Sequence, residues 1–470
     1  MPIKKDRKTY GERLDYMIRD LQRLIAAGTY PPGGYLPPES KLAEEYALSN
    51  KSVRKGLEQL VAEGAITKIN RVGNQVTGRS AADKAVITLG YTESIERDLE
   101  LQQMLEEFHQ QHPSIQVNTI LMTPMGPSSH VRFPETVEPY LVNGIIDVFT
   151  VNQAQFLEFA EQQALELLEP LEPEAGAYHF LNDSFTAGGR QYVLPIVFSP
   201  VILCYNREHF RKAGMAEPDS SWTWHDTIRH AEALARPGER FGLYFYLMSE
   251  NRWPIFLLQG MHEGISRERF ASEMKELVRL VKLMLDHPAI FPKYLTEGSD
   301  DVNQLFLQEK VSMMLSSYFS LNELKHTKVP YDITPLPYLH RQGTLNVTIG
   351  MAVNRHTKQK EAAMTLVRYF ASKKSQQAIR ERTFSIPAHK AVAEQVGKEK
   401  YNLNRPPHYP MFRELFPSFQ SHRELRMNAA QFQAARTLLK NYWSGLITEE
   451  KLWEELPAYL PHMQPEAAQL

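Results

Sequence analysis

The stretch from Leu36 to Val76 constrains the fold of this chain more than any other part of it. It reads LPPESKLAEEYALSNKSVRKGLEQLVAEGAITKINRVGNQV and contains two helical segments separated by only a few residues. The first spans Glu39 to Tyr46. The second begins at Ser49 or Asn50, because either short polar side chain can cap a helix. Two short segments then flank a turn over residues 71–74. The pattern predicts a helix-turn-helix followed by a two-stranded wing.

Apolar periodicity predicts which faces of these elements are buried. An earlier helix over residues 10–27 carries one apolar stripe, and the wing strands cover residues 66–69 and 75–77. The expected core side chains of the two motif helices are Leu42, Ala43, Tyr46, Val53, Leu57, Leu60 and Val61. The opposite face of the last helix presents Asn50, Lys51, Arg54 and Lys55. A polar, cationic helix face of this kind suits the major groove of DNA.

The distribution of charge agrees with a nucleic-acid partner for this part of the chain. Residues 1–80 hold 14 Lys and Arg and 9 Asp and Glu, a balance of +5. The remaining residues hold 39 basic and 46 acidic side chains, a balance of −7. The nearly neutral whole therefore combines a basic head, suited to phosphate contact, with an acidic body.

Residues from about 9 to 78 resemble the winged helix-turn-helix of the GntR family of bacterial regulators. The matching positions are Tyr30, Gly34, Leu36, Pro37, Glu39, Leu42, Ala43, Tyr46, Ser49, Val53, Arg54, Leu57, Leu60, Glu63, Gly64, Ile66, Gly73 and Val76. In that family the recognition helix usually starts Ser-Arg-x-Thr-Val-Arg, and here Asn50 stands at the first arginine. Arg71 stands where the wing usually has its first glycine. The resemblance implies a DNA-binding surface made of Glu39, Ser49, Asn50, Lys51, Ser52, Arg54, Lys55, Arg71, Gly73 and Asn74.

The length of 470 residues is too great for one hydrophobic core, so further folding units must follow the head. We expect a DNA-binding domain over residues 1–78, a short polar linker over 79–84 and an effector domain over 85–470. The single cysteine, Cys204, excludes an internal disulfide. No signal-like segment or membrane-length apolar run is apparent, and we expect a cytoplasmic protein.

After the linker, strand-like and helix-like segments alternate. Residues 85–91, 115–121 and 145–151 read as strands, with helices over 95–112, 137–143 and 154–163. Further strands are expected near 196–205, 311–315 and 331–335, with helices near 224–235, 270–287, 301–309, 358–380 and 410–455. This alternation predicts an α/β fold with a mostly parallel sheet covered on both faces.

The body, over about residues 85–400, resembles the extracellular solute-binding proteins of ABC importers, particularly those that bind sugars. The motifs are CYNREHFRKAGM from Cys204, residues 221–226, FLQEKVSMM from Phe306, residues 335–337 and 349–354, and KEAAMTLVRYFASKKS from Lys360. Each motif is short, but they occur in the family's order. The resemblance implies a periplasmic-binding-protein-like body with two α/β lobes and a ligand cleft that closes between them.

Sugar recognition needs aromatic faces for the pyranose ring and polar groups for its hydroxyls. We expect such residues at strand ends and in loops that face the cleft. The candidate ligand-binding residues are Tyr91, Glu93, Asp147, Phe149, Asn251, Trp253, Tyr318 and Phe319. Trp222, Trp224 and Cys204 are expected to pack structurally.

Catalytic and metal sites find little support in the sequence. The pairs His109 with His112 and His225 with His230 lack a third ligand at a useful spacing. His262-Glu263-Gly264 lacks the second histidine of a zinc-protease helix. Some GntR-type heads are fused to pyridoxal-phosphate aminotransferase-like bodies, but no matching lysine context is present. We expect no cofactor, no metal and no catalysis.

Together these features predict a sugar-responsive transcription regulator that binds a palindromic operator as a homodimer. The alternatives are a sensor of another solute, such as a peptide or polyamine, a transport-type binding protein without regulation, and a carbohydrate-active enzyme.

Overall fold

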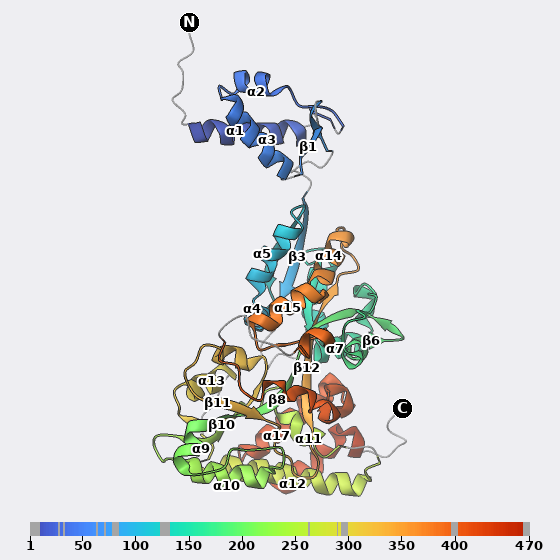
Figure 1. Ribbon diagram of the computed structural model, residues 1–470. Helices are drawn as coiled ribbons and strands as arrows, with labels where there is room; N and C mark the ends of the chain where they lie inside the picture. Colours follow the sequence, from blue (N-terminus) through green and yellow to red (C-terminus); the bar gives the residue numbers. More distant parts are fainter. Residues whose placement is uncertain are drawn as a thin grey trace. The chain divides into compact units, whose positions relative to one another are not determined.

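The structure is a computed structural model (Figure 1). It describes residues 10–26, 29–31, 33–62, 64–69, 72–77, 84–122, 132–261, 264–288, 290–292, 299–395 and 403–463. Contacts divide the chain into two compact units, residues 1–87 with 105–118 and residues 88–104 with 119–470. The expected linker over residues 79–84 lies outside the described part except for Lys84.

The head contains three helices and a hairpin. They are α1 (Tyr10–Ala26), α2 (Glu39–Glu45), α3 (Asn50–Ala62), β1 (Ile66–Ile69) and β2 (Gly73–Val76). The two strands pair antiparallel, with Ile66 opposite Val76. The core contains Leu14, Met17, Ile18, Leu21 and Ile25 of α1, together with Leu42, Tyr46, Val53, Leu57, Leu60, Ile66 and Val76. The predicted helix-turn-helix and wing are therefore present.

The turn between α2 and α3 is short and well defined. Ala47 adopts a left-handed backbone with φ 50°, and the amide of Leu48 bonds back to the carbonyl of Ala43 at 2.9 Å. Ser49 Oγ accepts from the amide of Ser52 at 3.2 Å, so Ser49 caps α3 as its short hydroxyl side chain allows. Val61 was expected in the core but is 38% exposed, because it lies one residue beyond Leu60 and so outside the apolar stripe.

The body is built on a ten-stranded sheet. Its main path is β4 (Ile115–Leu121), β3 (Ala85–Tyr91), β5 (Val148–Asn152), β12 (Thr344–Val353), β8 (Val193–Asn206), β10 (Val311–Ser317) and β9 (Phe241–Tyr244). The strands β11 (Tyr331–Thr334) and β13 (Ile386–Pro387) pair with β8, and β14 (Phe419–Gln420) pairs with β12. A separate small hairpin contains β6 (Thr186–Ala187) and β7 (Arg190–Gln191). We call the part built on β3, β4 and β5 the first lobe, and the part built on β9, β10 and β11 the second lobe.

The sheet is mixed, so the prediction of a mostly parallel sheet was wrong. Parallel pairing occurs between β3 and β5 and between β10 and β9. In contrast, β12 is antiparallel to both β5 and β8. The reason is that β8 carries the chain from the first lobe into the second, and β12 brings it back. Figure 1 shows these two strands at the junction of the lobes.

Helices of the first lobe cover its part of the sheet. They are α4 (Ser94–Leu99), α5 (Leu101–Gln111), α6 (Phe133–Val142), α7 (Gln153–Glu161), α14 (Lys360–Ala371) and α15 (Lys373–Arg382). Two short helices, α8 (His179–Ser184) and α16 (Lys390–Ala393), instead belong to the core cluster that includes β8 and the second lobe. Two helices that the sequence predicts as continuous, over residues 95–112 and 358–380, are each divided into two shorter helices. Glu100 adopts a left-handed backbone with φ 52° between α4 and α5, and extended Ser372 ends α14 and caps α15.

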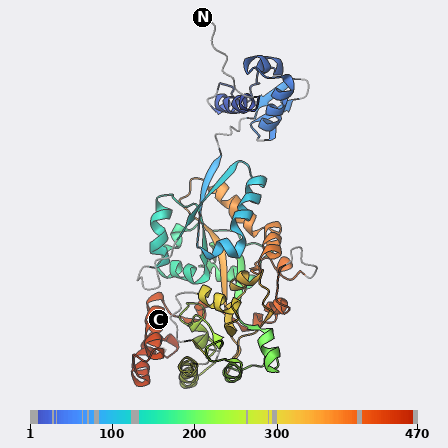
Figure 2. The same ribbon diagram turned by 90° about the vertical axis from the view of Figure 1, so that its left-hand side faces the viewer.

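The second lobe carries α9 (Arg207–Ala213), α10 (Trp224–Leu234), α11 (Trp253–Leu258), α12 (Arg267–Asp286) and α13 (Ser299–Leu307). Towards the C-terminus, α17 (Ala429–Trp443) and α18 (Glu449–Glu455) lie against this lobe, and Figure 2 shows them in red. Trp443 Nε1 donates to the carbonyl of Val278 on α12 at 3.1 Å. The C-terminal helices are therefore part of the second lobe's packing.

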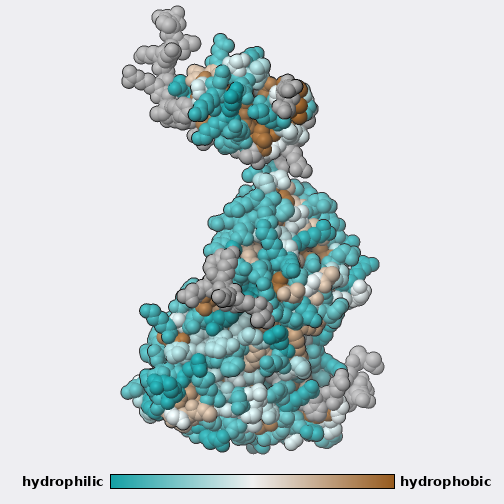
Figure 3. Space-filling model, in the orientation of Figure 1, coloured by the Kyte–Doolittle hydropathy of each residue, from teal (hydrophilic) through white to brown (hydrophobic). Residues whose placement is uncertain are grey.

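Figure 3 shows a mostly hydrophilic face with scattered hydrophobic residues. Within the described ranges, no helix is both long enough and apolar enough to cross a membrane.

Glu158 on α7 gives a pH-dependent prediction. Burial raises the pKa of this carboxyl group to about 6. The amide of Phe133 donates to the carboxylate at 2.8 Å and lowers the pKa, but by less than burial raises it. Because the pKa in the unfolded chain lies near 4.5, the folded state is increasingly penalised as the pH rises from 4.5 past 6. Glu158→Gln keeps an acceptor and cannot ionise. We expect it to be more stable than the parent above pH 6, by at most about 2 kcal/mol.

Thermal unfolding at several pH values tests this expectation. The variant and the parent should have the same stability below pH 4.5. Their difference should grow between pH 4.5 and 6 and level off above 6. Glu138→Gln, at an exposed position of α6, removes the same charge and is the matched control. A stability difference that is constant across the whole pH range would contradict the assignment.

Candidate DNA interface and ligand cleft

The exposed face of α3 carries the candidate DNA contacts. Ser49, Asn50, Lys51, Arg54 and Lys55 are all exposed, as the sequence predicts. The side chain of Arg54 is 62% exposed, and its Nε lies 2.6 Å from Oε2 of Glu39 at the start of α2. An exposed ion pair adds little to stability. It does hold the guanidinium in one orientation above the helix surface.

Two residues predicted to contact DNA are buried in the head. Ser52 is buried, and its hydroxyl bonds to that of Ser49 at 2.6 Å, so it supports the start of α3. Asn74 is buried in β2, where its carbonyl accepts from the amide of Leu36 at 2.9 Å. Their burial does not follow from apolar periodicity, because Ser52 supports the first turn of α3 and Asn74 lies within β2. Gly73 has φ 146°, a backbone that favours glycine, and Arg71 lies outside the described residues.

A cavity of about 340 Å³ in the body is lined by residues of both lobes. The first lobe contributes the segment after β3, the end of β5 and the start of α7. The second lobe contributes the loop before α11 and the segment after β10, and β12 forms part of the wall. The lining residues are Thr92, Ser94, Arg97, Asp98, Thr150, Val151, Asn152, Gln155, Ser249, Asn251, Arg252, Ser317, Phe319, Ser320, Val347 and Ile349.

Hydrogen-bonding groups of the first lobe are directed to this cavity. Asn152 and Gln155 form a capping box at the start of α7, in which each side-chain oxygen accepts a backbone amide at 2.9 Å. The box leaves Asn152 Nδ2 and Gln155 Nε2 as donors for a ligand. Thr150 Oγ1 is buried and has no hydrogen-bond partner within the described part of the chain. Such a wall suits a ligand rich in hydroxyl and carbonyl oxygens.

Charged groups occur on both sides of the cavity. Arg97 Nε lies 3.0 Å from Oδ1 of the buried Asp98, and Arg97 also pairs with Glu323. Asn322 Nδ2 donates to Asp98 as well, at 3.4 Å. These contacts compensate the charges of Arg97 and Asp98 on the first lobe. Arg252 enters the cavity from the second lobe and is almost fully buried.

The structure brings two of the eight predicted ligand residues, Asn251 and Phe319, to the cavity wall. Tyr91 is half-buried and Glu93 is exposed, while Thr92 between them lines the cavity. Asp147 is buried, and its Oδ2 accepts from the amide of Thr88 at 2.8 Å. Alternation of side chains along a strand explains why the neighbours of a lining residue point elsewhere.

Three predicted aromatic contacts are core residues. Trp253 is 0% exposed, with its ring centroid 4.6 Å from that of Phe432. Tyr318 is also fully buried, and its hydroxyl donates to the carbonyl of Tyr409 at 2.9 Å. Phe149 packs with Phe159 inside the first lobe. The structure leaves these rings no free face for a sugar, so the prediction that they bind ligand is corrected.

Sequence reasoning missed most of the lining residues. One signal was present, because Asn152-x-x-Gln155 after an apolar strand is a capping-box pattern at a strand's carboxyl end. Arg252 stands between Asn251 and Trp253, which were both candidate ligand-binding residues. Arg97 and Asp98 lie on a helix whose orientation the sequence does not reveal.

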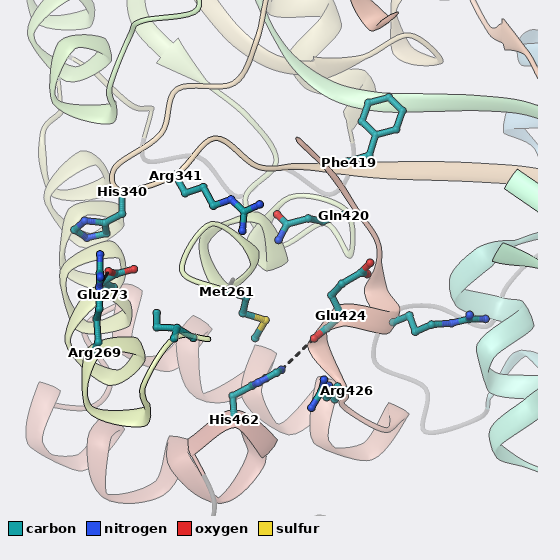
Figure 4. Close-up of a pocket in the computed structure, with 12 residues that line it drawn as sticks. Met261, Arg269, Glu273, His340, Arg341, Phe419, Gln420, Glu424, Arg426 and His462 are labelled. Atoms are coloured by element: carbon teal, nitrogen blue, oxygen red, sulfur yellow. Dashed lines mark hydrogen bonds and ion pairs between the residues drawn. The ribbon is translucent and has the colours of Figure 1, made fainter. Parts of the chain in front are cut away.

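A second, larger cavity of about 1130 Å³ lies in the second lobe and the segments packed on it (Figure 4). Its charged side chains include Arg269, which pairs with Glu273 at 2.7 Å, and Arg341. His462 Nε2 bonds to the carbonyl of Glu424 at 3.1 Å, the contact marked in Figure 4. The described residues that line this cavity belong to the second lobe and the segments packed on it. Within the described ranges, no cluster of three or more His, Cys, Asp and Glu suits a metal ion.

Comparisons with known proteins agree with this architecture. Residues 92–377 match the family model of bacterial extracellular solute-binding proteins, and residues 17–76 match that of bacterial regulatory proteins of the gntR family. A putative binding protein of Brucella abortus is 25% identical over 248 residues, which cover 48% of this chain and 58% of that protein. The uncharacterized HTH-type transcriptional regulator YieP of Escherichia coli is 28% identical over 130 residues, or 27% of this chain and 51% of that protein.

A solved structure shares the fold of the body. The maltose-bound MalE3 protein of T. maritima superposes with a TM-score of 0.68 at 18% identity, covering 81% of this chain and all of that one. Such identity establishes the fold alone. The chain belongs to the bacterial extracellular solute-binding protein family and carries a gntR-family helix-turn-helix domain at its N-terminus.

Proposed function

We propose that this chain is a transcription regulator whose body binds a sugar or oligosaccharide between its lobes and thereby changes DNA binding by its head. The observation that carries the proposal is a polar cavity lined by both lobes, on the same chain as a helix-turn-helix with an exposed cationic face. A ligand that contacts both lobes favours the closed arrangement by its differential affinity.

The chemistry of the cavity supports a polyhydroxylated ligand. Amide donors of Asn152 and Gln155, hydroxyls of Thr150, Ser317 and Ser320, and one aromatic side chain, Phe319, are all in its wall. Proteins of the same fold include one with maltose bound. In the cell, the head would bind a palindromic operator as a homodimer, because the symmetry of half-sites mirrors that of the protein. A cytoplasmic location follows from this role.

Two alternatives are less consistent with the site. A polyamine would bring positive charge next to Arg252, a buried cation with no carboxylate partner within the described residues. A carbohydrate-active enzyme needs a suitably spaced acid and base. Among the described residues of the cavity wall the single carboxylate is Asp98, and Arg97 holds it. A peptide sensor would share the donor-rich wall, and ligand screening separates it from a sugar sensor.

Thermal unfolding of the full chain against mono- and oligosaccharides tests the proposal. A ligand present at about 100 times its Kd should stabilise the body by about 2.7 kcal/mol and raise its midpoint. The matched variant Gln155→Ala, which removes one cavity donor, should reduce this stabilisation. No stabilisation by any saccharide, together with stabilisation by a peptide library, would contradict sugar binding.

A further inference from the structure

Arg252 is unusual among the buried charges of the body. It stands directly before α11, and only 5% of its surface is exposed. Its guanidinium makes one hydrogen bond to the described residues, from a terminal nitrogen to the carbonyl of Asn251 at 3.3 Å. No carboxylate of the described residues forms an ion pair with it. A guanidinium has five N–H donors, so most of its bonding capacity is unused.

Two other buried charges of the body have a basic side chain beside them. Asp98, 1% exposed, faces Arg97 at 3.0 Å. Asp332, equally buried, accepts from the ring of His408 at 2.7 Å. Buried charges are costly unless a partner compensates them. Burial lowers the pKa of Arg252 to about 10, which still leaves the guanidinium charged at neutral pH.

The partner that Arg252 lacks has a place in the ligand cavity. Arg252 lines this cavity together with the amide groups of Asn152 and Gln155, whose oxygens are already used in the capping box. Among the described residues that line the cavity, the charged ones are Arg97, Asp98 and Arg252, a balance of +1. The free groups are therefore mainly donors, next to one uncompensated cation.

We propose that the effector is an acidic sugar, whose anionic oxygen group, a carboxylate or a phosphate, binds to Arg252. The inference rests on the proposed sugar-sensing function and specifies its ligand class. A planar guanidinium matches either group with two parallel hydrogen bonds. The hydroxyls of the same sugar would bind to the amides of Asn152 and Gln155.

Calorimetry on the full chain with matched sugars tests the proposal. The probes are glucose with glucuronate and glucose 6-phosphate, galactose with galacturonate, and maltose with maltobionate. We expect an acidic member to bind at least about tenfold more tightly than its neutral counterpart, which corresponds to 1.4 kcal/mol. The uronate and phosphate arms distinguish the two anionic groups.

Arg252→Gln should remove this preference, so that each acidic sugar binds within about twofold of its neutral counterpart on the same variant. Arg341→Gln removes the same charge from the larger cavity and should keep the preference. If Arg252→Gln does not fold, the paired sugars on the parent chain still decide. Tighter binding of the neutral sugars would contradict an acidic effector but would still support the proposed sugar-sensing function. Binding of no sugar in either class would overturn both.

Discussion

Replacing Arg54 by alanine should weaken specific operator binding roughly tenfold to a hundredfold for each head, while the head stays folded. Arg54 projects from the exposed face of α3, and Glu39 holds its guanidinium at 2.6 Å. An arginine in this position can bond two acceptors of a guanine edge in the major groove. Its exposed ion pair contributes little to folding. The loss should therefore appear in DNA binding and not in the unfolding midpoint of the head.

Gel-shift titration with an operator selected from random DNA measures the effect. The matched control is Arg279→Ala, because Arg279 is 61% exposed and pairs with Glu449 at 2.7 Å on the body. It should bind DNA like the parent. Retained specific binding by the Arg54 variant would contradict the assignment of α3 as the recognition helix. A loss of helical signal in the variant would instead assign Arg54 to folding.

Gly242→Ala should destabilise the second lobe strongly. A Cβ atom built on Gly242 would lie 2.0 Å from the carbonyl oxygen of Ala231 and 2.4 Å from its carbonyl carbon. These are backbone atoms of α10, so the clash is relieved only if α10 moves away from β9. Overpacking of a core costs about 1–3 kcal/mol and occasionally more, and a backbone clash belongs at the upper end. Ligand affinity should fall too, because β9 leads into the loop that carries Arg252.

Denaturant unfolding of the body measures this loss. Gly260→Ala is the control, since its Cβ would meet Met274 Cε at an ordinary 3.4 Å. We expect it to change stability by less than about 1 kcal/mol. Equal stability of the two variants would contradict the close packing of α10 on β9.

Local patterns predicted the head well because its elements follow one another in the chain. The apolar stripe, the cap at Ser49 and the hairpin require no distant contact. The prediction was less successful where a residue's surroundings decide its role. Ser52 and Asn74 look like exposed polar residues in sequence, yet both are buried, Ser52 at the start of α3 and Asn74 in β2.

The body shows the same difference on a larger scale. Strand and helix segments were identified, but the antiparallel course of β8 and β12 depends on a chain that crosses between lobes twice. Trp253 and Tyr318 have the residue type expected of sugar contacts, and packing against Phe432 and Tyr409 uses their surfaces. Arg252 has no sequence pattern of its own, and only its burial without a countercharge singles it out.

The central claim is that ligand binding in the cleft and operator binding by the head are coupled. The most direct measurement is the operator affinity of the full chain with and without the saccharide that stabilises it most. We expect a change of about 5- to 150-fold, and the same factor in sugar affinity when the operator is present, since such coupling is reciprocal. Identical operator affinity in the absence of the sugar and at saturation would contradict the claim.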